Sequence, residues 1–212
     1  AHANWPMVQA AIDFVLALQY PEGDIRWTAR DPQTPEEDAL LTGNSSIHKS
    51  LSCALALADA LGHDVPHWHD ARTRLADALA HKPERYDRTW AAKDRYSMDW
   101  YYPVLSGALN LEQGQERLQQ GWDKFILEGF GCRCVADEPW VTVAETAELV
   151  MALVSQGETQ KAETLLSGLD QFRDEKGAYW MGMQVEQKVF WPVEKPAWTA
   201  GAVILAFDSV HR

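Results

Sequence analysis

The chain has 212 residues, of which 46% are hydrophobic, and it carries a formal net charge of -12 at pH 7. This length and composition suit one folded domain with a sizeable core, and they exclude a disordered chain. Nucleic acid and anionic membranes are also excluded as partners, because both need a basic face and no cluster of lysine and arginine stands out. We therefore expect a small-molecule substrate.

Cysteine content and hydropathy indicate the compartment. Three cysteines are too few for a disulfide framework, no apolar run reaches the length of a membrane span, and no signal sequence opens the chain. These features favour a cytoplasmic protein without stable membrane insertion. Cys132 and Cys134 lack the second pair that a structural zinc site needs, so neither a metal nor a cofactor is predicted.

Apolar periodicity predicts eight helices of two alternating kinds. The first of each pair has a polar face, and the second is almost wholly apolar. In chain order they span Trp5–Gln19, Asn44–Leu61, His67–Ala80, Met98–Leu109, Glu112–Ile126, Val141–Val154, Thr159–Phe172 and Ala197–Val210. The repeating unit is an outer amphipathic helix, a long loop and an inner apolar helix.

The loops differ in length at the two ends of this repeat. Outer-to-inner connections are long, whereas inner-to-outer connections such as Gly62–Pro66 and Gln156–Glu158 are short. The inner helices therefore begin at one face, which carries the long loops and the expected pocket. Alternating residues within Ala178–Val189 predict a short hairpin of strands.

Four tryptophans precede the inner helices: Trp27, Trp90, Trp140 and Trp191. One interpretation is structural, with each indole wedged between neighbouring hairpins. The other is functional, with the rings forming an aromatic wall for a carbocation, a sugar ring or a prenyl chain. Both interpretations remain open, since different members of the set can serve different roles.

The loops Leu16–Trp27 and Leu169–Trp180 each join a Gln at a helix end to a Gly and then a Trp. This pattern resembles the QW repeat of squalene–hopene cyclases. The chain is also similar to uncharacterised bacterial prenyltransferase-like and squalene-cyclase-like proteins, through the segments Leu40–Leu51, Met98–Leu109, Gly131–Leu149 and Phe190–Val203. The resemblance implies an all-α fold, an α/α toroid of about four helical hairpins in a single domain over residues 1–212.

The resemblance also implies further hairpins, but the chain departs from the catalytic motifs of these families. Further hairpins precede this region in such relatives, so the toroid is expected to be incomplete at its N-terminus. An apolar flank on the first hairpin should then be covered by a preceding segment or by another subunit; its residues are Ile12, Val15, Ile47 and Leu51. The DxDD acid of class II terpene cyclases is absent, and no Asp, Cys, His zinc set of protein prenyltransferases can be placed.

Acidic residues cluster at the starts of the inner helices. Asp99 opens the second inner helix, Glu145 lies one turn into the third, and Glu194 precedes the fourth. Carboxylates at helix N-termini often serve as caps, which is the structural alternative. Because a buried carboxylate is rare unless paired, Glu145 should either face a polar pocket or pair with Arg133 or Lys195. We predict Asp99, Glu145 and Glu194 as catalytic acids or bases.

Aromatic and polar residues at the same face are predicted to bind the substrate. Glu148 shares a helix face with Glu145 at i,i+3 spacing. The full predicted binding set is His48, Trp100, Tyr101, Tyr102, Trp140, Glu148, Trp191, Trp198 and Thr199. Ordinary core packing is the alternative for the aromatic residues, and a structural role is the alternative for His48.

Three functions follow from these features. The favoured one is an enzyme that applies acid/base chemistry to a small apolar or isoprenoid-like substrate in a Trp/Tyr-lined pocket, as the resemblance to terpenoid cyclases and prenyltransferases implies. The second is a carbohydrate-active or carbohydrate-binding α/α barrel, since tryptophan platforms and paired carboxylates also suit sugars. The third is a non-catalytic scaffold.

Overall fold

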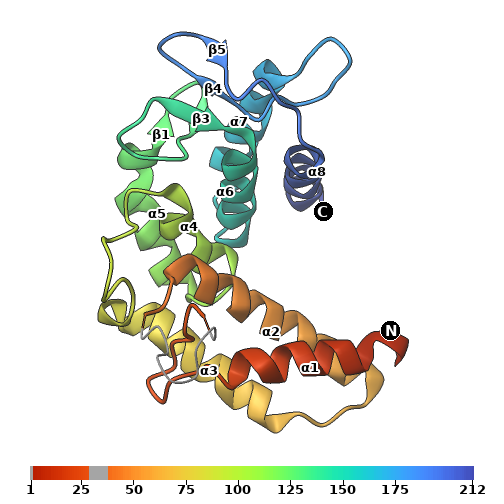
Figure 1. Cartoon of the computed structure of the whole chain (residues 1–212). Helices are drawn as coiled ribbons and strands as arrows, with labels where there is room; N and C mark the ends of the chain where they lie inside the picture. The colour runs from red at the N-terminus through yellow and green to blue at the C-terminus, as the bar shows by residue number, and fades with distance from the viewer. Residues whose placement is uncertain (1, 29–37) are drawn as a thin grey trace. The chain divides into compact units, whose positions relative to one another are not determined.

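The computed structural model describes residues 2–28 and 38–212, and over these residues the chain is mostly helical (Figure 1). The α-helices are α1 (Trp5–Leu16), α2 (Leu41–Leu61), α3 (Pro66–His81), α4 (Ser97–Leu105), α5 (Leu111–Phe125), α6 (Val143–Ser155), α7 (Thr159–Gly168) and α8 (Ala197–His211). Short 3-10 helices occupy His2–Asn4, Pro83–Arg85 and Leu169–Phe172. Among these described helices, none combines the length and the hydropathy that a membrane span requires.

Two small antiparallel sheets accompany the helices. One pairs β1 (Ile126–Leu127) with β2 (Gly131–Cys132), and the other has the order β3 (Trp140–Thr142), β4 (Gly182–Gln184), β5 (Val189–Phe190). β4 lies inside the loop where the sequence predicts strands, and β5 begins at the last residue of that loop. The predicted hairpin is therefore confirmed.

All eight predicted helices are present, so the α-rich fold is confirmed, while the strands make it not strictly all-α. Two helices end or begin at residues other than those predicted. α4 ends at Leu105 rather than Leu109, and Gly107 after it adopts a positive φ of 72°. α6 begins at Val143 because Val141 pairs with Met183 in the sheet.

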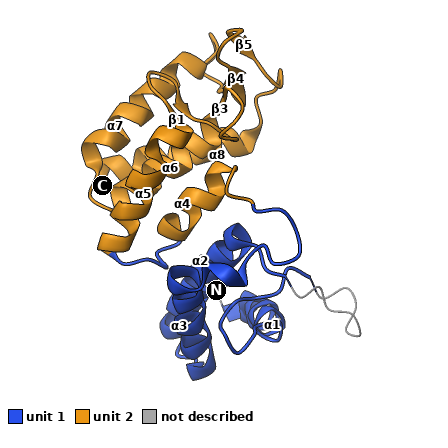
Figure 2. Cartoon of the chain, turned by 90° about the vertical axis from the view of Figure 1, so that its left-hand side faces the viewer, with its two compact units in different colours: residues 1–92, 106–110 blue, residues 93–105, 111–212 orange. Residues whose placement is uncertain are grey.

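The chain divides into two compact units, residues 1–92 with 106–110 and residues 93–105 with 111–212 (Figure 2). In the first unit, α2 packs against α3 and helices α1 to α3 share one core. Leu51, Trp68 and Leu75 are fully buried in that core. The indole of Trp68 also makes a hydrogen bond, in which Nε1 donates to the Asp13 carboxylate at 2.9 Å.

In the second unit, α6 is the central helix, with α4, α7 and α8 packed against it. Eight of its 13 residues are buried. Small side chains such as Ala144, Ala147 and Ala152 let these neighbours approach closely. α5 packs on α4, and α7 also packs on α8. This arrangement places one face of α6 between α4 and α8.

Two predictions about burial were wrong. α8 was expected to be a buried inner helix, but Ile204, Leu205 and Phe207 are 56–67% exposed. Ile12 and Leu51, expected on an exposed flank of the first hairpin, lie in the core of the first unit. Apolar composition predicts that a helix packs, but it does not show on how many sides it does so.

Candidate functional site

A pair of tyrosines from α4 holds a glutamate of α6. The hydroxyl of Tyr101 donates to Oε2 of Glu148 at 2.6 Å, and that of Tyr102 donates to Oε1 at 3.2 Å. Adjacent residues of a helix point about 100° apart. Both phenol side chains nevertheless reach Glu148, because they are long and because α4 packs against α6. Both carboxyl oxygens are thereby fixed in orientation.

Burial dominates the electrostatics of Glu148. It raises the pKa of this carboxyl above the ordinary value of 4.5, and the charge of Glu145 raises it further, while the two tyrosine hydrogen bonds lower it without cancelling the effect. Burial and the charge of Glu148 also raise the pKa of both tyrosines, so they stay protonated as donors. Glu148 is therefore a carboxyl that holds its proton more firmly than an ordinary glutamate.

Glu145 lies one turn before Glu148 on the same helix. Its Oε2 is buried without a hydrogen-bond partner among the described residues. Burial, the charge of Glu145 and a hydrogen bond with it raise the pKa of the Cys134 thiol to about 12. The described residues contain no group of three or more side chains able to hold a metal ion. Glu145 thus faces a protonated thiol and a second carboxyl.

The predicted ion-pair partners of Glu145 are engaged elsewhere. Arg133 donates to the carbonyl oxygen of Ala136 at 2.9 Å. Lys195 pairs with Asp174, whose pKa this ammonium lowers to about 2. No ion pair of Glu145 with Arg133 or Lys195 is present among the described residues, and its predicted position at a polar pocket stays a prediction.

A groove of about 540 Å³ runs between α6 and α8 and reaches Glu148. Trp198, in the first turn of α8, is 57% exposed at this groove. Figure 1 shows α6 and α8 side by side. The remaining lining residues are Ala144, Met151, Gly201, Ala202, Ile204 and Leu205. Glu148, which the tyrosines hold, is thus also a lining residue of an apolar groove.

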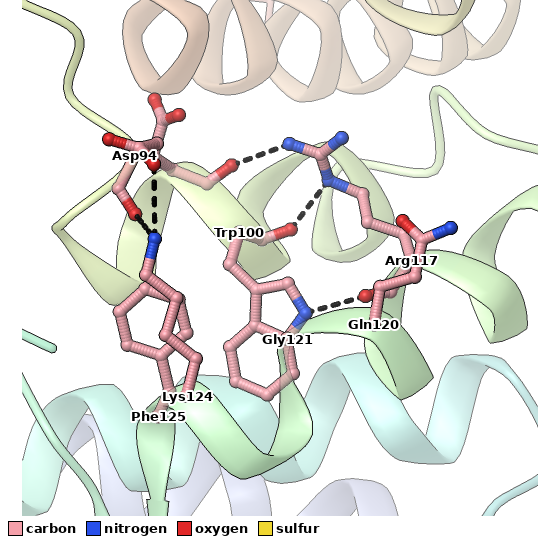
Figure 3. Close-up of a pocket in the computed structure, with 8 residues that line it drawn as sticks. Asp94, Trp100, Arg117, Gln120, Gly121, Lys124 and Phe125 are labelled. Atoms are coloured by element: carbon pink, nitrogen blue, oxygen red, sulfur yellow. Dashed lines mark hydrogen bonds and ion pairs between the residues drawn. The ribbon is translucent and has the colours of Figure 1, made fainter.

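Asp99 lines a different cavity, of about 200 Å³, shown in Figure 3. There Arg117 donates to the backbone carbonyl oxygens of Asp99 and Trp100, at 2.8 and 2.7 Å. Trp100 in turn donates from Nε1 to the carbonyl oxygen of Arg117 at 2.7 Å and stacks on Phe125. A Cβ atom on Gly121 would lie 2.3 Å from that indole nitrogen. Trp100 therefore joins α4 to α5 while it also lines this cavity, and the binding role predicted for it stays a prediction.

Other predicted residues lie around the three-stranded sheet. Trp140 donates from Nε1 to the carbonyl oxygen of Trp191 at 2.8 Å, and Trp191 is 61% exposed. Glu194 is exposed and accepts the backbone N–H of Met181 at 2.9 Å through its carbonyl. Thr199 is buried in the first turn of α8. None of these four residues lines the groove at Glu148, and their roles in catalysis or binding stay predictions.

His48 belongs to the first unit. Its Nδ1 lies 3.2 Å from the carbonyl oxygen of Ser106, and burial lowers its pKa. Trp27 and Trp90 also lie in this unit and contact each other edge to face, with ring centroids 6.5 Å apart. The binding role predicted for His48 stays a prediction, and both interpretations of the two indoles remain open.

No protein-family profile matches the chain. The chain is 46% identical, over all 212 of its residues, to the MMP endo-(1,4)-3-O-methyl-alpha-D-mannosidase of Mycolicibacterium hassiacum. It spans 58% of the length of that enzyme. By its name, the relative acts on a carbohydrate.

This similarity overturns the resemblance to terpenoid cyclases and prenyltransferase-like proteins, together with the isoprenoid-type function drawn from it. The resemblance depended on the alternation of helices and on loops that join Gln, Gly and Trp. Glycine commonly ends helices and tryptophan buries a large apolar surface in protein cores, whatever reaction a protein catalyses. They describe architecture, whereas reaction chemistry depends on the residues of the site.

Sequence reasoning missed most of the groove. Met151 follows Glu148 by three residues, and Gly201 follows Trp198 by three, so each lies on the same helix face as a predicted site residue. That i,i+3 spacing was the available signal. The groove itself depends on the packing of α8 against α6, which local spacing does not reveal.

Proposed function

We propose that this protein is a glycoside hydrolase that cleaves internal linkages in chains of α-(1,4)-linked 3-O-methylmannose. The observation that carries the proposal is the 46% identity, over every residue of the chain, to an enzyme named for that activity. A carbohydrate-active protein was the second function that the sequence left open. The half-buried carboxyl of Glu148 at a tryptophan-edged groove supports it.

Glu148 is assigned as the general acid. Glycosidases protonate the departing glycosidic oxygen with a carboxylic acid whose pKa is raised, while water adds a hydroxyl to the anomeric carbon. Burial raises the pKa of Glu148, which keeps the proton available closer to neutral pH. Tyr101 and Tyr102 act as positioning residues, since they hold both oxygens of this carboxyl.

Glu145 is assigned as the second carboxylate of the reaction. Glycosidases use a second carboxylate as a nucleophile or to activate water. Side chains at i,i+3 on a helix have Cβ atoms about 5–6 Å apart, which places Glu145 near the proposed acid. Its charge already raises the pKa of Glu148, so the two groups are electrostatically coupled.

The α/α ring is also part of the proposal. In the second unit, α4, α6 and α8 form a row, with α5 and α7 packed on α4 and α6 respectively. Alternating inner and outer helices of this kind are what a ring of hairpins requires. Additional hairpins or another subunit that complete the ring, and a cytoplasmic location, remain predictions from the sequence.

The proposed activity is tested by incubating the protein with oligosaccharides of α-(1,4)-linked 3-O-methylmannose. Mass spectrometry of the products should show internal cleavage into shorter oligosaccharides, together with new reducing ends. An α-(1,4)-linked glucan serves as the control and should stay intact. If the methylated oligosaccharide also stays intact, the proposed function is wrong.

The Tyr102→Phe variant should shift the pH dependence of this activity. The Tyr102 hydrogen bond stabilises the ionised form of Glu148 and so lowers its pKa. Its loss should raise that pKa, by about half to one pH unit. A general acid works only while protonated, so the alkaline limb of the kcat profile should move to higher pH. A shift to lower pH would contradict the assignment of Glu148 as the acid.

A further inference from the structure

The groove between α6 and α8 is unusual for a sugar site, because seven of its eight lining residues are apolar. Glu148 is its one ionisable group. A bare hexose presents hydroxyls on most of its ring carbons, and each hydroxyl that is buried without a partner costs free energy. A groove with a single carboxyl therefore disfavours a fully hydroxylated sugar.

A sugar that carries methyl ethers reverses this preference. A methyl ether replaces a hydroxyl donor with an apolar group, which gains from leaving water. Met151 from α6 and Ile204 and Leu205 from α8 supply aliphatic surface in the groove. The exposed indole of Trp198 adds a flat apolar surface at the same groove.

Gly201 opens the space between these groups. A Cβ atom added to Gly201 would meet no other atom within 4 Å. The residue follows Trp198 by three positions, so its missing side chain leaves room next to the indole on the same face of α8. The groove volume of about 540 Å³ lies within the ordinary range for small-molecule pockets.

We propose that this groove recognises the O-methyl groups of a methylated hexose chain, and that Met151, Trp198 and Gly201 determine this specificity. The inference rests on the proposed function, and it goes further by assigning the discrimination between methylated and bare sugar to one surface. Glu148 accepts or donates one hydrogen bond to the sugar, and the aliphatic residues contact the methyl ethers.

Binding measurements on the full chain test this assignment. Isothermal titration calorimetry would compare a tetrasaccharide of α-(1,4)-linked 3-O-methylmannose with unmethylated α-(1,4)-linked mannotetraose, and every protein titrated carries Glu148→Gln so that the ligand is not cleaved. The protein with an otherwise wild-type groove should prefer the methylated ligand by at least roughly fourfold, the effect of burying one methyl group. Gly201→Leu should fill the groove and abolish this preference. Met151→Gln, of similar size but polar, should reduce it toward equal affinity.

The control variant is Phe207→Ala, which removes an exposed apolar side chain of α8 that does not line the groove. Its preference should equal that of the protein with the otherwise wild-type groove. Because Gly201 faces open space, Gly201→Leu should keep the wild-type circular dichroism spectrum; if it does not, Met151→Gln decides the result.

The results separate the two proposals. One outcome is a higher affinity for the methylated ligand that is lost in the groove variants, with no cleavage of that ligand by the wild-type protein. This outcome would support the inference and contradict the proposed hydrolase activity. The opposite outcome is cleavage of the methylated chain together with a binding preference that Gly201→Leu and Met151→Gln leave unchanged. This outcome would support the proposed hydrolase activity and overturn the inference. Equal affinity of the protein with the otherwise wild-type groove for both ligands would also overturn it.

Discussion

Replacing Glu148 with glutamine is expected to lower kcat on the methylated oligosaccharide by about 10²–10⁴-fold, the contribution of a positioned general acid. The amide has nearly the same shape and its oxygen still accepts a hydrogen bond from the tyrosine pair. It cannot give up a proton to the leaving oxygen. Folding should be retained, because the amide is nearly isosteric with the half-buried carboxyl and adds no volume.

The measurement is the rate at which new reducing ends appear, together with circular dichroism of the variant. Glu163→Gln is the matched control, since Glu163 is an exposed glutamate on α7. It should retain the wild-type rate. If Glu148→Gln is folded and turns over at that rate too, the acid lies elsewhere and the site assignment fails.

Replacing Asp24 with alanine is expected to destabilise the fold by about 3–5 kcal/mol, the cost of removing one partner from a buried ion pair. Asp24 is fully buried and pairs with Arg85 at 2.8 Å and Arg88 at 3.0 Å. Both guanidinium groups also lie over the ring of Tyr20. Without the carboxylate, two neighbouring cations lose their common partner. Because each arginine is about one-fifth exposed, water should keep the loss near the lower end of that range.

Urea denaturation followed by circular dichroism measures this loss. Asp137→Ala is the matched control, because Asp137 also pairs with an arginine, Arg95, but both side chains are about half exposed. An exposed pair contributes less than about 1 kcal/mol. Equal losses in the two variants would contradict the importance of burial at Asp24.

The tyrosine–glutamate arrangement shows how far the site could be predicted. Tyr101, Tyr102, Glu145 and Glu148 were all candidates, because polar groups at the start of an apolar helix are conspicuous. Their pairing was not predictable, since Glu148 lies 46 positions after Tyr102 in the chain. Asp99 looked equivalent in sequence to Glu145 and Glu148, yet it lines the cavity at Arg117 and not the groove at Glu148. Position near a helix start does not determine which face a side chain occupies.

The sequence by itself determined the eight helices and the short hairpin of strands, because both depend on local periodicity and on the backbone preferences of nearby residues. Only the tertiary structure decided the helix ends at Leu105 and Val143, the exposure of α8 and the groove against α6. These features depend on contacts between segments far apart in the chain. Hydrophobic burial is non-directional, so the apolar sequence of α8 is compatible with packing on any of several faces. Its contacts with α6 in the tertiary structure determine which face is buried.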